Sequence, residues 1–368
     1  MNRIIDFLKK EIVLSVSFVL ALISMFLVPP SEKYFDYIDF RTLGLLFSLM
    51  TIMAGLNKMG IFRLLAKNLL NKAKTMRGVT LLLVLLCFFS SMLITNDVAL
   101  ITFVPFSVVL LKLANKQNRM IFVVTLETIA ANLGSMLTPI GNPQNLYLFS
   151  AYNMSISDFF YTIAPYAMLS LGLLVIFSLF SDKSELANLG DREEVIFDKR
   201  LLTMYAVLFA IALLSVFRVL NHIVLLAVVI VFVLIFDRKV LLKVDYSLLF
   251  TFVFLFIFIG NLGNIAQINS WLSEIVGGNE VVVGVLASQV FSNVPAAILL
   301  SGFTCNAAAL MIGVNIGGLG TLIASMASLI SFKFIQKESV SIAKYLGVFT
   351  LLNVVFLAAN LALWVVVK

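Results

Sequence analysis

Two polar stretches interrupt long apolar runs in this chain, and their residue types suggest chemistry rather than packing alone. The first, ANLGSMLTPIGNPQNLY at 131–147, holds two Gly, two Pro and three Asn beside Ser, Thr and Gln. The second is NIGGLGTLIAS at 315–325. Non-helical backbone among membrane helices is tolerated only where protein buries it or where it lines an aqueous cavity. Both stretches therefore indicate broken helices at a binding site.

Broken helices offer two kinds of ligand. The N-terminus of a half-helix presents N–H groups and a partial positive charge, which suits an anion. Carbonyl oxygens at half-helix C-termini, together with threonine hydroxyls, suit Na⁺, because hard cations prefer oxygen ligands. Glycine lets the chain turn and approach a ligand, and we expect Pro139 and Pro143 to end the preceding half-helix. The alternative is a Gly/Pro kink that serves packing.

Two further polar triplets each lie between apolar segments: TND at 95–97 and SNV at 292–294. An asparagine side chain offers both a donor and an acceptor, as a hydrogen-bonded ligand requires. Asn96 and Asn293 are therefore candidate ligands, with hydrogen bonding between helices as the alternative.

Two acids lie in the same apolar surroundings. An acid within the membrane is costly, so it usually has a function. Asp97 could bind a cation or carry a coupling proton, or it could cap a half-helix that begins at Val98. Glu127, five residues before Asn132, could be a proton site or could pair inside the helix bundle.

The composition predicts a membrane protein. Of the 368 residues, 61% are hydrophobic and 12% charged, whereas a soluble domain has about 45–50% apolar and about 25% charged residues. The net charge of +7 does not indicate nucleic-acid binding, because Lys and Arg lie in short loops between apolar runs. Cys87, Cys305 and a turn residue, His222, supply no metal cluster. Neither H-E-x-x-H nor G-x-S-x-G occurs, so we expect no enzyme.

The apolar segments predict an all-α polytopic membrane protein with two re-entrant hairpins, two broken helices and about nine full spans. The hairpins are expected near 78–111 and 282–304, and the broken helices near 119–149 and 309–332. The expected units are an N-terminal transmembrane helix at 1–39, a first repeat at 40–180, a cytoplasmic linker with two scaffold helices at 181–244, and a second repeat at 245–368.

Loop charges suggest an orientation in the cytoplasmic membrane. Loops 58–77 and 112–119 carry Lys and Arg without any acid, so they should be cytoplasmic, as should the N-terminus. Stretches 268–281 and 305–308 contain neither Lys nor Arg and should be external loops. Residues 61–74 should form an amphipathic helix on the inner face.

The two halves resemble each other and should have opposite orientations. SMLITNDVALITFVPF at 91–106 aligns with SQVFSNVPAAILLSGF at 288–303, which pairs Asn96 with Asn293. NLGSMLTPIGNPQNL at 132–146 aligns with NIGGLGTLIASMASL at 315–329, which pairs Asn132 with Asn315. Inverted repeats with paired interrupted helices are typical of secondary transporters.

At these residues the chain resembles the ion transporter superfamily, over about residues 40–368. That group includes arsenite permeases, citrate carriers, divalent-anion/sodium symporters and sodium/proton antiporters. The most specific piece is LTPIGNPQNL, which is similar to the G-[ND]-P-x-N-[LI] signature of these relatives. The chain departs from the hairpin motifs at Asp97 and Val294, where the symporters have a hydroxyl.

The resemblance implies an elevator-type carrier, often a homodimer, with a sodium site in each half and two asparagine-bearing tips that touch substrate. The residues expected to bind substrate are Asn96, Asn293, Asn142, Gln144, Asn145, Thr138 and Thr321. The residues expected to couple ion movement are Thr95, Asp97, Glu127, Ser292, Asn132, Asn315, Gly134 and Gly317. Na⁺ is expected at Thr95, Asn96, Asp97 and Gly141, and at Ser292, Asn293 and Gly320.

We therefore expect a secondary transporter that moves a small anion, such as citrate or an inorganic oxyanion, with Na⁺ or H⁺ as coupling ion and no other cofactor. The expected partners are that anion, the lipid bilayer and a second copy of the chain. Two alternatives remain within transport: an arsenite or antimonite permease, which fits the scarcity of basic residues at the breaks, and a sodium/proton antiporter, which fits Asp97.

Overall fold

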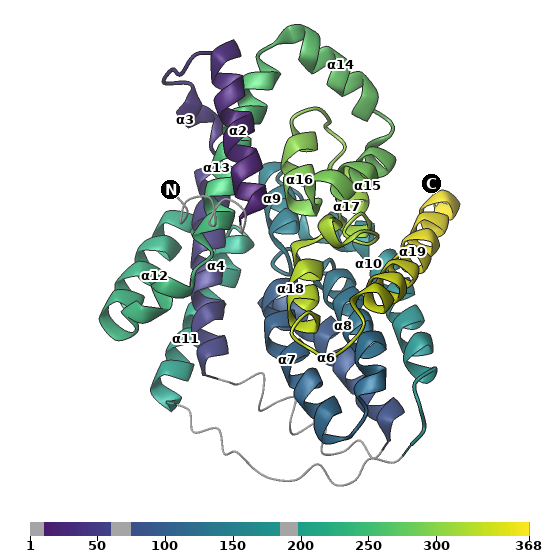
Figure 1. Ribbon diagram of the computed structural model, residues 1–368. Helices are drawn as coiled ribbons and strands as arrows, with labels where there is room; N and C mark the ends of the chain where they lie inside the picture. Colours follow the sequence, from purple (N-terminus) through teal and green to yellow (C-terminus); the bar gives the residue numbers. More distant parts are fainter. Residues whose placement is uncertain (1–10, 60–74, 185–197, 368) are drawn as a thin grey trace, which may run out of the picture.

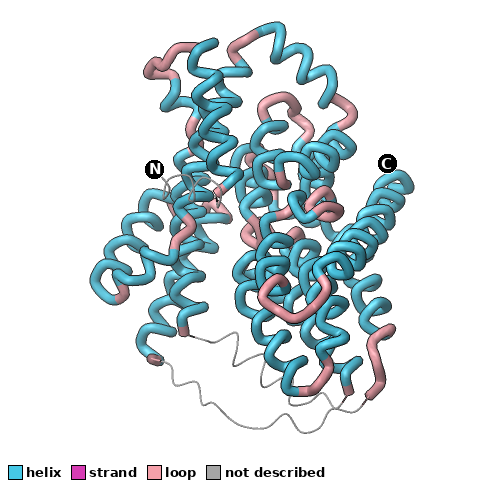
Figure 2. Tube along the Cα trace, viewed as in Figure 1, coloured by secondary structure: helices cyan, strands magenta, loops and turns pink. Residues whose placement is uncertain are grey.

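The computed structural model describes residues 11–59, 75–184 and 198–367, and within them every regular element is a helix (Figures 1 and 2). The all-α class expected from the sequence is confirmed. The expected amphipathic helix at 61–74 and most of the expected linker, residues 185–197, lie outside the described residues.

One group of helices is built on α4 (Phe40–Lys58) and on α13 (Tyr246–Gly263), and α4 begins where the Asp39 carboxylate accepts the Thr42 N–H at 3.0 Å. The group also contains α2 (Ile12–Leu27), α3 (Tyr34–Tyr37), α11 (Lys199–Val216), α12 (His222–Phe236) and η2 (Arg238–Lys243). Helix α13 lies along α2, and α11 and α12 pack against α4 (Figure 1). We call these elements the α4 group.

The second group contains the first predicted hairpin and the first predicted break. The hairpin is α6 (Met76–Ile94) and α7 (Asn96–Leu113), and the chain then passes through η1 (Gln117–Arg119). The broken helix is α8 (Met120–Ser135) and α9 (Pro143–Ala151), followed by α10 (Ile156–Leu179). Helix α8 is buried along its length because it packs against α6, α7 and α10.

The same order of elements occurs a second time near the C-terminus. Helices α15 (Glu280–Phe291) and α16 (Asn293–Ser301) meet at Ser292 and pack against each other. The next pair is α17 (Ala307–Ile316) and α18 (Met326–Ile335), with η3 (Leu322–Ala324) between them, and α19 (Ile342–Val367) follows. Because α16 packs on α9 and α18 packs on α7 and α8, the two sets of helices form one body. We call this body the hairpin group.

One predicted loop is wrong. Stretch 268–281 was expected to be an external loop, yet α14 (Ala266–Val276) occupies most of it. Apolar residues recur there at helical spacing, at Ile268, Leu272 and Ile275, and no proline or glycine interrupts them. The side chain of Trp271 is 61% exposed, as suits an aromatic residue at a membrane surface.

Length and composition support a multi-pass membrane protein. Among the described residues, six helices are long and apolar enough to cross a bilayer, and up to seven if α14 and α15, which meet at 108°, count as one span. Large apolar side chains such as Phe26 and Val366 are 88% and 82% exposed. A lipid environment accounts for such exposure, whereas water would penalise it.

Candidate functional site

A cavity of about 540 Å³ lies between the two helix groups, beside the tip of the first hairpin. Helix α4, the start of α7, the start of α9 and the start of α13 all contribute to its wall. The polar and charged residues that line it are Asn57, Lys58, Thr95, Asp97, Thr102, Asn142, Lys243 and Asp245. Its size suits a small ligand, since ligand cavities commonly measure about 300–1,000 Å³.

The tip of the first hairpin has an unusual backbone. Thr95 has φ 72° and ψ 154°, a region that is essentially restricted to glycine. This conformation separates α6 from α7 within one residue. The Asn96 N–H then donates to the Gly141 carbonyl at 3.2 Å, and Asn96 Nδ2 donates to Asn132 Oδ1 at 3.2 Å. The tip and the break that were predicted to share a sodium site are therefore in contact.

Asp97 lies in the first turn of α7, which begins at Asn96 rather than at Val98 as predicted. Its backbone N–H donates to Asn96 Oδ1 at 3.0 Å, and the Asp97 carboxylate does not cap the helix. The carboxylate borders the cavity, and no donor among the described residues reaches its buried Oδ1. The helix N-terminus favours a negative charge at this place. The free oxygen is available to a cation or a proton.

The first break is organised by its asparagines. Asn142 caps α9, since its Oδ1 accepts the Asn145 N–H at 2.9 Å. Asn145 Nδ2 donates to the carbonyls of Met136 and Thr138, at 2.9 and 3.2 Å. The predicted role of the prolines is wrong: α8 ends at Ser135, four residues before the first proline. Pro143 instead occupies the first turn of α9, where its missing N–H costs nothing.

The tip of the second hairpin has nearly the same backbone conformation. Ser292 has φ 71° and ψ 154°, and Asn293 begins α16 just as Asn96 begins α7. Ser292 is 1% exposed, and neither it nor Asn293 lines the 540 Å³ cavity. The second tip is therefore a buried copy of the first tip.

Gln289, which was not among the predicted site residues, holds the second break. Its Nε2 donates to the carbonyls of Gly317 and Leu319 at 2.8 and 2.9 Å, and its Oε1 accepts the Thr321 N–H at 3.0 Å. Gly320 has φ 113° and packs against the Gln289 side chain, so closely that an added Cβ would lie 2.4 Å from Gln289 Oε1. The sequence feature that could have identified Gln289 is a single glutamine within the apolar helix α15.

The two breaks are joined by reciprocal hydrogen bonds. Asn142 Nδ2 in the first break donates to Asn315 Oδ1 at 3.1 Å. Ser325 Oγ in the second break donates to Asn132 Oδ1 at 2.9 Å. A further bond runs from Asn315 Nδ2 to Asn145 Oδ1 at 2.6 Å. The structure therefore brings together the predicted residues of both breaks.

Other predicted residues do not reach the cavity. Thr138 donates its hydroxyl to the Met92 carbonyl, Thr321 is exposed, and Gln144 is buried beside the break. Gly134 and Gly317 allow close helix packing. An added Cβ at Gly134 would lie 2.2 Å from the Phe88 carbonyl oxygen, and one at Gly317 would lie 2.9 Å from Val285 Cα.

Glu127 lies inside the bundle, not at the cavity. Its Oε1 accepts the Ser107 hydroxyl at 2.5 Å and lies 3.9 Å from the Cys87 sulfur. The residue is fully buried, and Oε2 has no partner among the described groups. The structure therefore places Glu127 inside the helix bundle, which is the second of the two environments that the sequence suggested for it.

Three charged residues of the cavity wall, Lys58, Lys243 and Asp245, were missed because they lie at helix ends, where the sequence suggests only loop charges. Lys58 ends α4 and pairs with Asp237 at 2.8 Å, and Tyr205 donates to that carboxylate at 3.2 Å. Asp245 caps α13 by accepting the Leu248 N–H at 3.0 Å. No ion pair joins Lys243 to another residue in the described part of the chain. The wall thus holds two ammonium groups and two carboxylates.

Helices of this length and exposure, with a polar cavity at their broken ends, define a polytopic membrane transporter. The family model described as citrate transporter matches residues 4–309, and the chain belongs to this family. The chain is 32% identical over 348 residues to an uncharacterized transporter of Methanocaldococcus jannaschii. The match covers 94% of this chain and 95% of that protein.

Two other relatives are also named as membrane or transport proteins. The chain is 32% identical over 326 residues to the inner membrane protein YbiR of Escherichia coli, covering 84% of this chain and 83% of that protein. It is 33% identical over 162 residues to a silicon efflux transporter of Oryza sativa subsp. japonica, covering 43% of this chain and 32% of that protein. The expected superfamily membership is confirmed.

Proposed function

We propose that this chain is a secondary active transporter that moves a small anion, such as a di- or tricarboxylate or an inorganic oxyanion, across the cytoplasmic membrane with Na⁺ or H⁺. The observation that carries the proposal is the 540 Å³ cavity, which joins the first hairpin tip to the first break and holds charges of both signs. A carrier of this kind needs an anion site and a coupling-ion site that are close together.

The anion is held by positive charge. Lys58 and Lys243 lie on the cavity wall, and the starts of α7 and α9 contribute Thr95 and Asn142 to it. Each half-helix start carries a partial positive charge. Asn142 and Pro143 belong to the stretch that resembles the family signature, which supports a substrate role for this end of the cavity.

The coupling ion binds at the same tip, in the same cavity. Asp97 supplies a carboxylate oxygen without a partner among the described residues, and the neighbouring Asn96 N–H donates to the Gly141 carbonyl, which places the break beside the tip. Thr95 adds a hydroxyl at the cavity wall. Oxygen ligands of this kind suit Na⁺, and the same carboxylate could carry H⁺ instead.

The reciprocal bonds between the breaks support the inverted repeat. Under the alignment of residues 132–146 with 315–329, Asn142 corresponds to Ser325 and Asn132 to Asn315. The bonds Asn142–Asn315 and Ser325–Asn132 are therefore two copies of one contact. Reciprocity of this kind is expected around a two-fold axis. It favours two repeats that exchange access to the two sides of the membrane.

Contacts among the loops support the predicted sidedness. Lys116 pairs with Asp182 at 3.6 Å, so the loop 112–119 and the start of the linker, which were both predicted to be cytoplasmic, lie together, and Lys112 also pairs with Glu338. In an elevator mechanism the α4 group would stay in place, and the hairpin group would carry the ligand past it. That motion must break the bond between Thr102 Oγ1 and Asn57 Oδ1, which is 3.0 Å long.

A cation or metalloid carrier is the second candidate. The carboxylates of Asp97 and Asp245 both border the cavity, which favours a cation over a multivalent anion. A sodium/proton antiporter would use Asp97 as its exchange site. An arsenite or antimonite permease would need neither lysine.

The experiment is a transport assay on purified protein in proteoliposomes, read as currents on a solid-supported membrane. Citrate, succinate, phosphate, sulfate and arsenite would be applied with and without Na⁺ and pH gradients. A saturable current with a carboxylate or oxyanion supports the proposal and identifies the coupling ion. Currents from Na⁺ and H⁺ gradients alone would favour the antiporter, and arsenite movement alone would favour the permease.

A further inference from the structure

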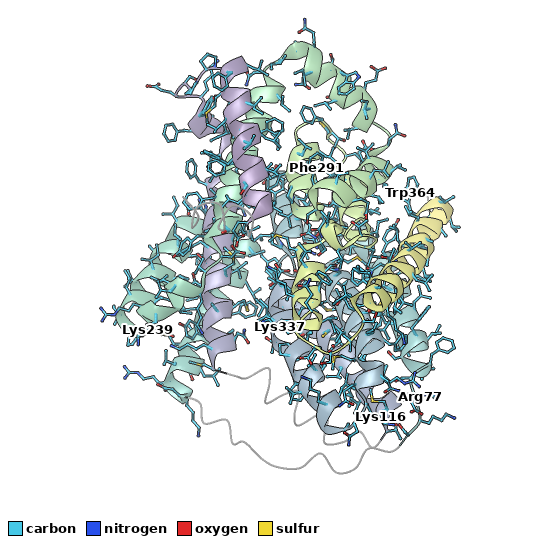
Figure 3. All side chains as sticks on the ribbon, viewed as in Figure 1. Arg77, Lys116, Lys239, Phe291, Lys337 and Trp364 are labelled. Carbon is cyan, nitrogen blue, oxygen red and sulfur yellow. The ribbon has the colours of Figure 1, made fainter. Side chains whose placement is uncertain are left out.

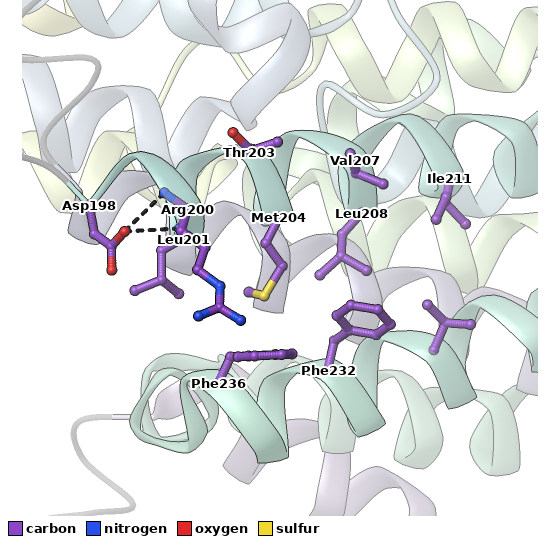
Figure 4. Close-up of a pocket in the computed structure, with 11 residues that line it drawn as sticks. Asp198, Arg200, Leu201, Thr203, Met204, Val207, Leu208, Ile211, Phe232 and Phe236 are labelled. Carbon is purple, nitrogen blue, oxygen red and sulfur yellow. Dashed lines mark hydrogen bonds between the residues drawn. The ribbon is translucent and has the colours of Figure 1, made fainter.

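A second hollow, of about 620 Å³, lies between α11 and α12, away from the transport cavity (Figure 4). Its walls are mostly apolar. The lining residues are Asp198, Arg200, Leu201, Thr203, Met204, Val207, Leu208, Ile211, Val228, Phe232 and Phe236. Leu208 forms a buried floor at 1% exposure, whereas Val207 and Phe236 are 52% and 45% exposed at its edges. We call it the α11–α12 groove.

One end of the groove is cationic. The Arg200 guanidinium lies 5.5 Å from the centre of the Phe236 ring, across the groove opening. Arg238 and Lys239 follow the end of α12 directly and are exposed, and Figure 3 labels Lys239 there. Because α11 begins and α12 ends at this place, the three cations gather at one end.

The nearby acids offset these cations only in part. Asp198, whose Oδ1 caps α11 by accepting the backbone N–H groups of Arg200 and Leu201 at 2.9 and 3.3 Å, brings one negative charge to the three cations. Asp237 is engaged by Lys58 and Tyr205. Within the described residues no salt bridge involves Arg200 or Lys239. The end of the groove therefore carries a net positive charge.

The length of the groove matches one leaflet of a bilayer. From Arg200 to Ile211 the helix rises about 16 Å at 1.5 Å per residue. Half of a hydrocarbon core is about 15 Å thick. The α11–α12 groove is apolar and about one leaflet long, and its cations lie at the end near the membrane surface. It fits an anionic amphiphile whose phosphate contacts Arg200 and whose acyl chain lies on Leu208.

A second copy of this chain fits the same surface less well. A two-fold contact through the groove would bring Arg200 and Lys239 near their own copies, and Asp198 is a single acid against them because Asp237 already pairs with Lys58. Like charges at an interface oppose association.

We propose that the α11–α12 groove binds one anionic phospholipid, with Arg200 and its neighbouring cations on the phosphate and one acyl chain along the apolar floor. The proposal does not depend on the transported substrate. The site lies in the α4 group, and a lipid bound there would contact both α11 and α12 and so stabilise their packing. The chemistry that the site selects is the charge of the headgroup, since the apolar floor accepts the chain of any phospholipid.

The test compares phosphatidylglycerol with phosphatidylcholine of identical acyl chains. Delipidated full-length protein in detergent would be titrated with each lipid, and bound lipid would be counted by native mass spectrometry. We expect phosphatidylglycerol to bind at least about fivefold more tightly, because the apolar contacts are the same and only the charge differs. Arg200→Gln should remove most of that preference.

Lys337→Gln is the matched control, because Lys337 also lies over an aromatic ring, 5.6 Å from the centre of Phe334, but outside the groove. It should keep the preference for the anionic lipid. Val207→Trp, which fills the apolar part, should weaken both lipids equally. Equal binding of the two lipids by the unmodified protein would overturn the proposal. So would an unchanged preference in Arg200→Gln, or cross-linking of two copies through Val207→Cys that excludes lipid.

Discussion

The two hairpin tips share a backbone and differ in what surrounds it. Thr95 and Ser292 have φ of 72° and 71° with the same ψ of 154°, and each precedes an asparagine that begins a helix. Thr95 borders a cavity, whereas Ser292 is buried. The same local geometry thus borders a cavity at the first hairpin and is closed off at the second.

The contact between hairpin and break also differs between the two halves. In the first half, a side chain of the break, Thr138, donates to the backbone of the hairpin at Met92. In the second half a side chain of the hairpin, Gln289, holds the backbone of the break through Gly317 and Leu319. Met92 and Gln289 occupy the same place in the alignment of the halves. Each break is therefore held by its own hairpin, but the side chain that makes the contact belongs to the break in the first half and to the hairpin in the second.

The largest expected effect is at Asp97, the acid that only the first tip has. Asp97→Asn keeps the shape of the side chain and removes its charge, so ion-dependent transport should fall by about tenfold or more. The measurement is uptake into proteoliposomes with and without a Na⁺ or pH gradient. Val294→Asn, at the matching position of the second tip, should leave the ion dependence unchanged. Equal ion dependence in Asp97→Asn and the unmodified protein would remove Asp97 from the coupling site.

The next effect concerns stability at the second break. Gln289→Leu leaves two carbonyls and one N–H without their partner, so it should destabilise the protein by about 1–3 kcal/mol. Met92→Leu, the matched change in the first half, should cost less than about 1.5 kcal/mol because the break there uses only the Met92 backbone. Thermal unfolding in detergent compares them. Equal losses would show that the two breaks are held in the same way.

A smaller effect should come from the backbone of the tips. Thr95→Gly and Ser292→Gly should each stabilise the protein by about 1 kcal/mol, because glycine adopts this conformation without strain. Thr95→Ala removes the hydroxyl but keeps the strain, so it should not stabilise. The readout is again the unfolding temperature. A lower unfolding temperature in Thr95→Gly would mean that the threonine side chain stabilises the protein by more than the backbone strain destabilises it.

The smallest effect is expected at Glu127, the buried acid away from the cavity. Glu127→Gln keeps an acceptor for the Ser107 hydroxyl and avoids a charge in apolar surroundings, so transport should change less than about twofold. Uptake measured beside that of Asp97→Asn checks this. Loss of ion coupling in Glu127→Gln would place a proton pathway through the bundle.

The sequence predicts the helical class, the hairpins and the breaks because each depends on local patterns, namely apolar runs interrupted by Gly, Pro and Asn. It also places Asn96 next to the first break. It does not predict that Lys58, Lys243 and Asp245 border the cavity, since only tertiary packing brings the ends of α4 and α13 to the hairpin tip. It misassigns α14 because an amphipathic surface helix has few apolar residues. The role of Gln289 depends on a contact 28 residues away in the chain.

The measurement that separates the two tips most directly is substrate protection of single cysteines. In a background with Cys87→Ala and Cys305→Ser, Ile101→Cys would report on the first tip and Ile323→Cys on the second break. These positions are 46% and 55% exposed, and Ile101 lines the cavity. The substrate identified by the transport currents should slow maleimide labelling of Ile101→Cys and leave Ile323→Cys unaffected. Protection at Ile323→Cys alone, or at neither position, would contradict a ligand site at the first hairpin tip.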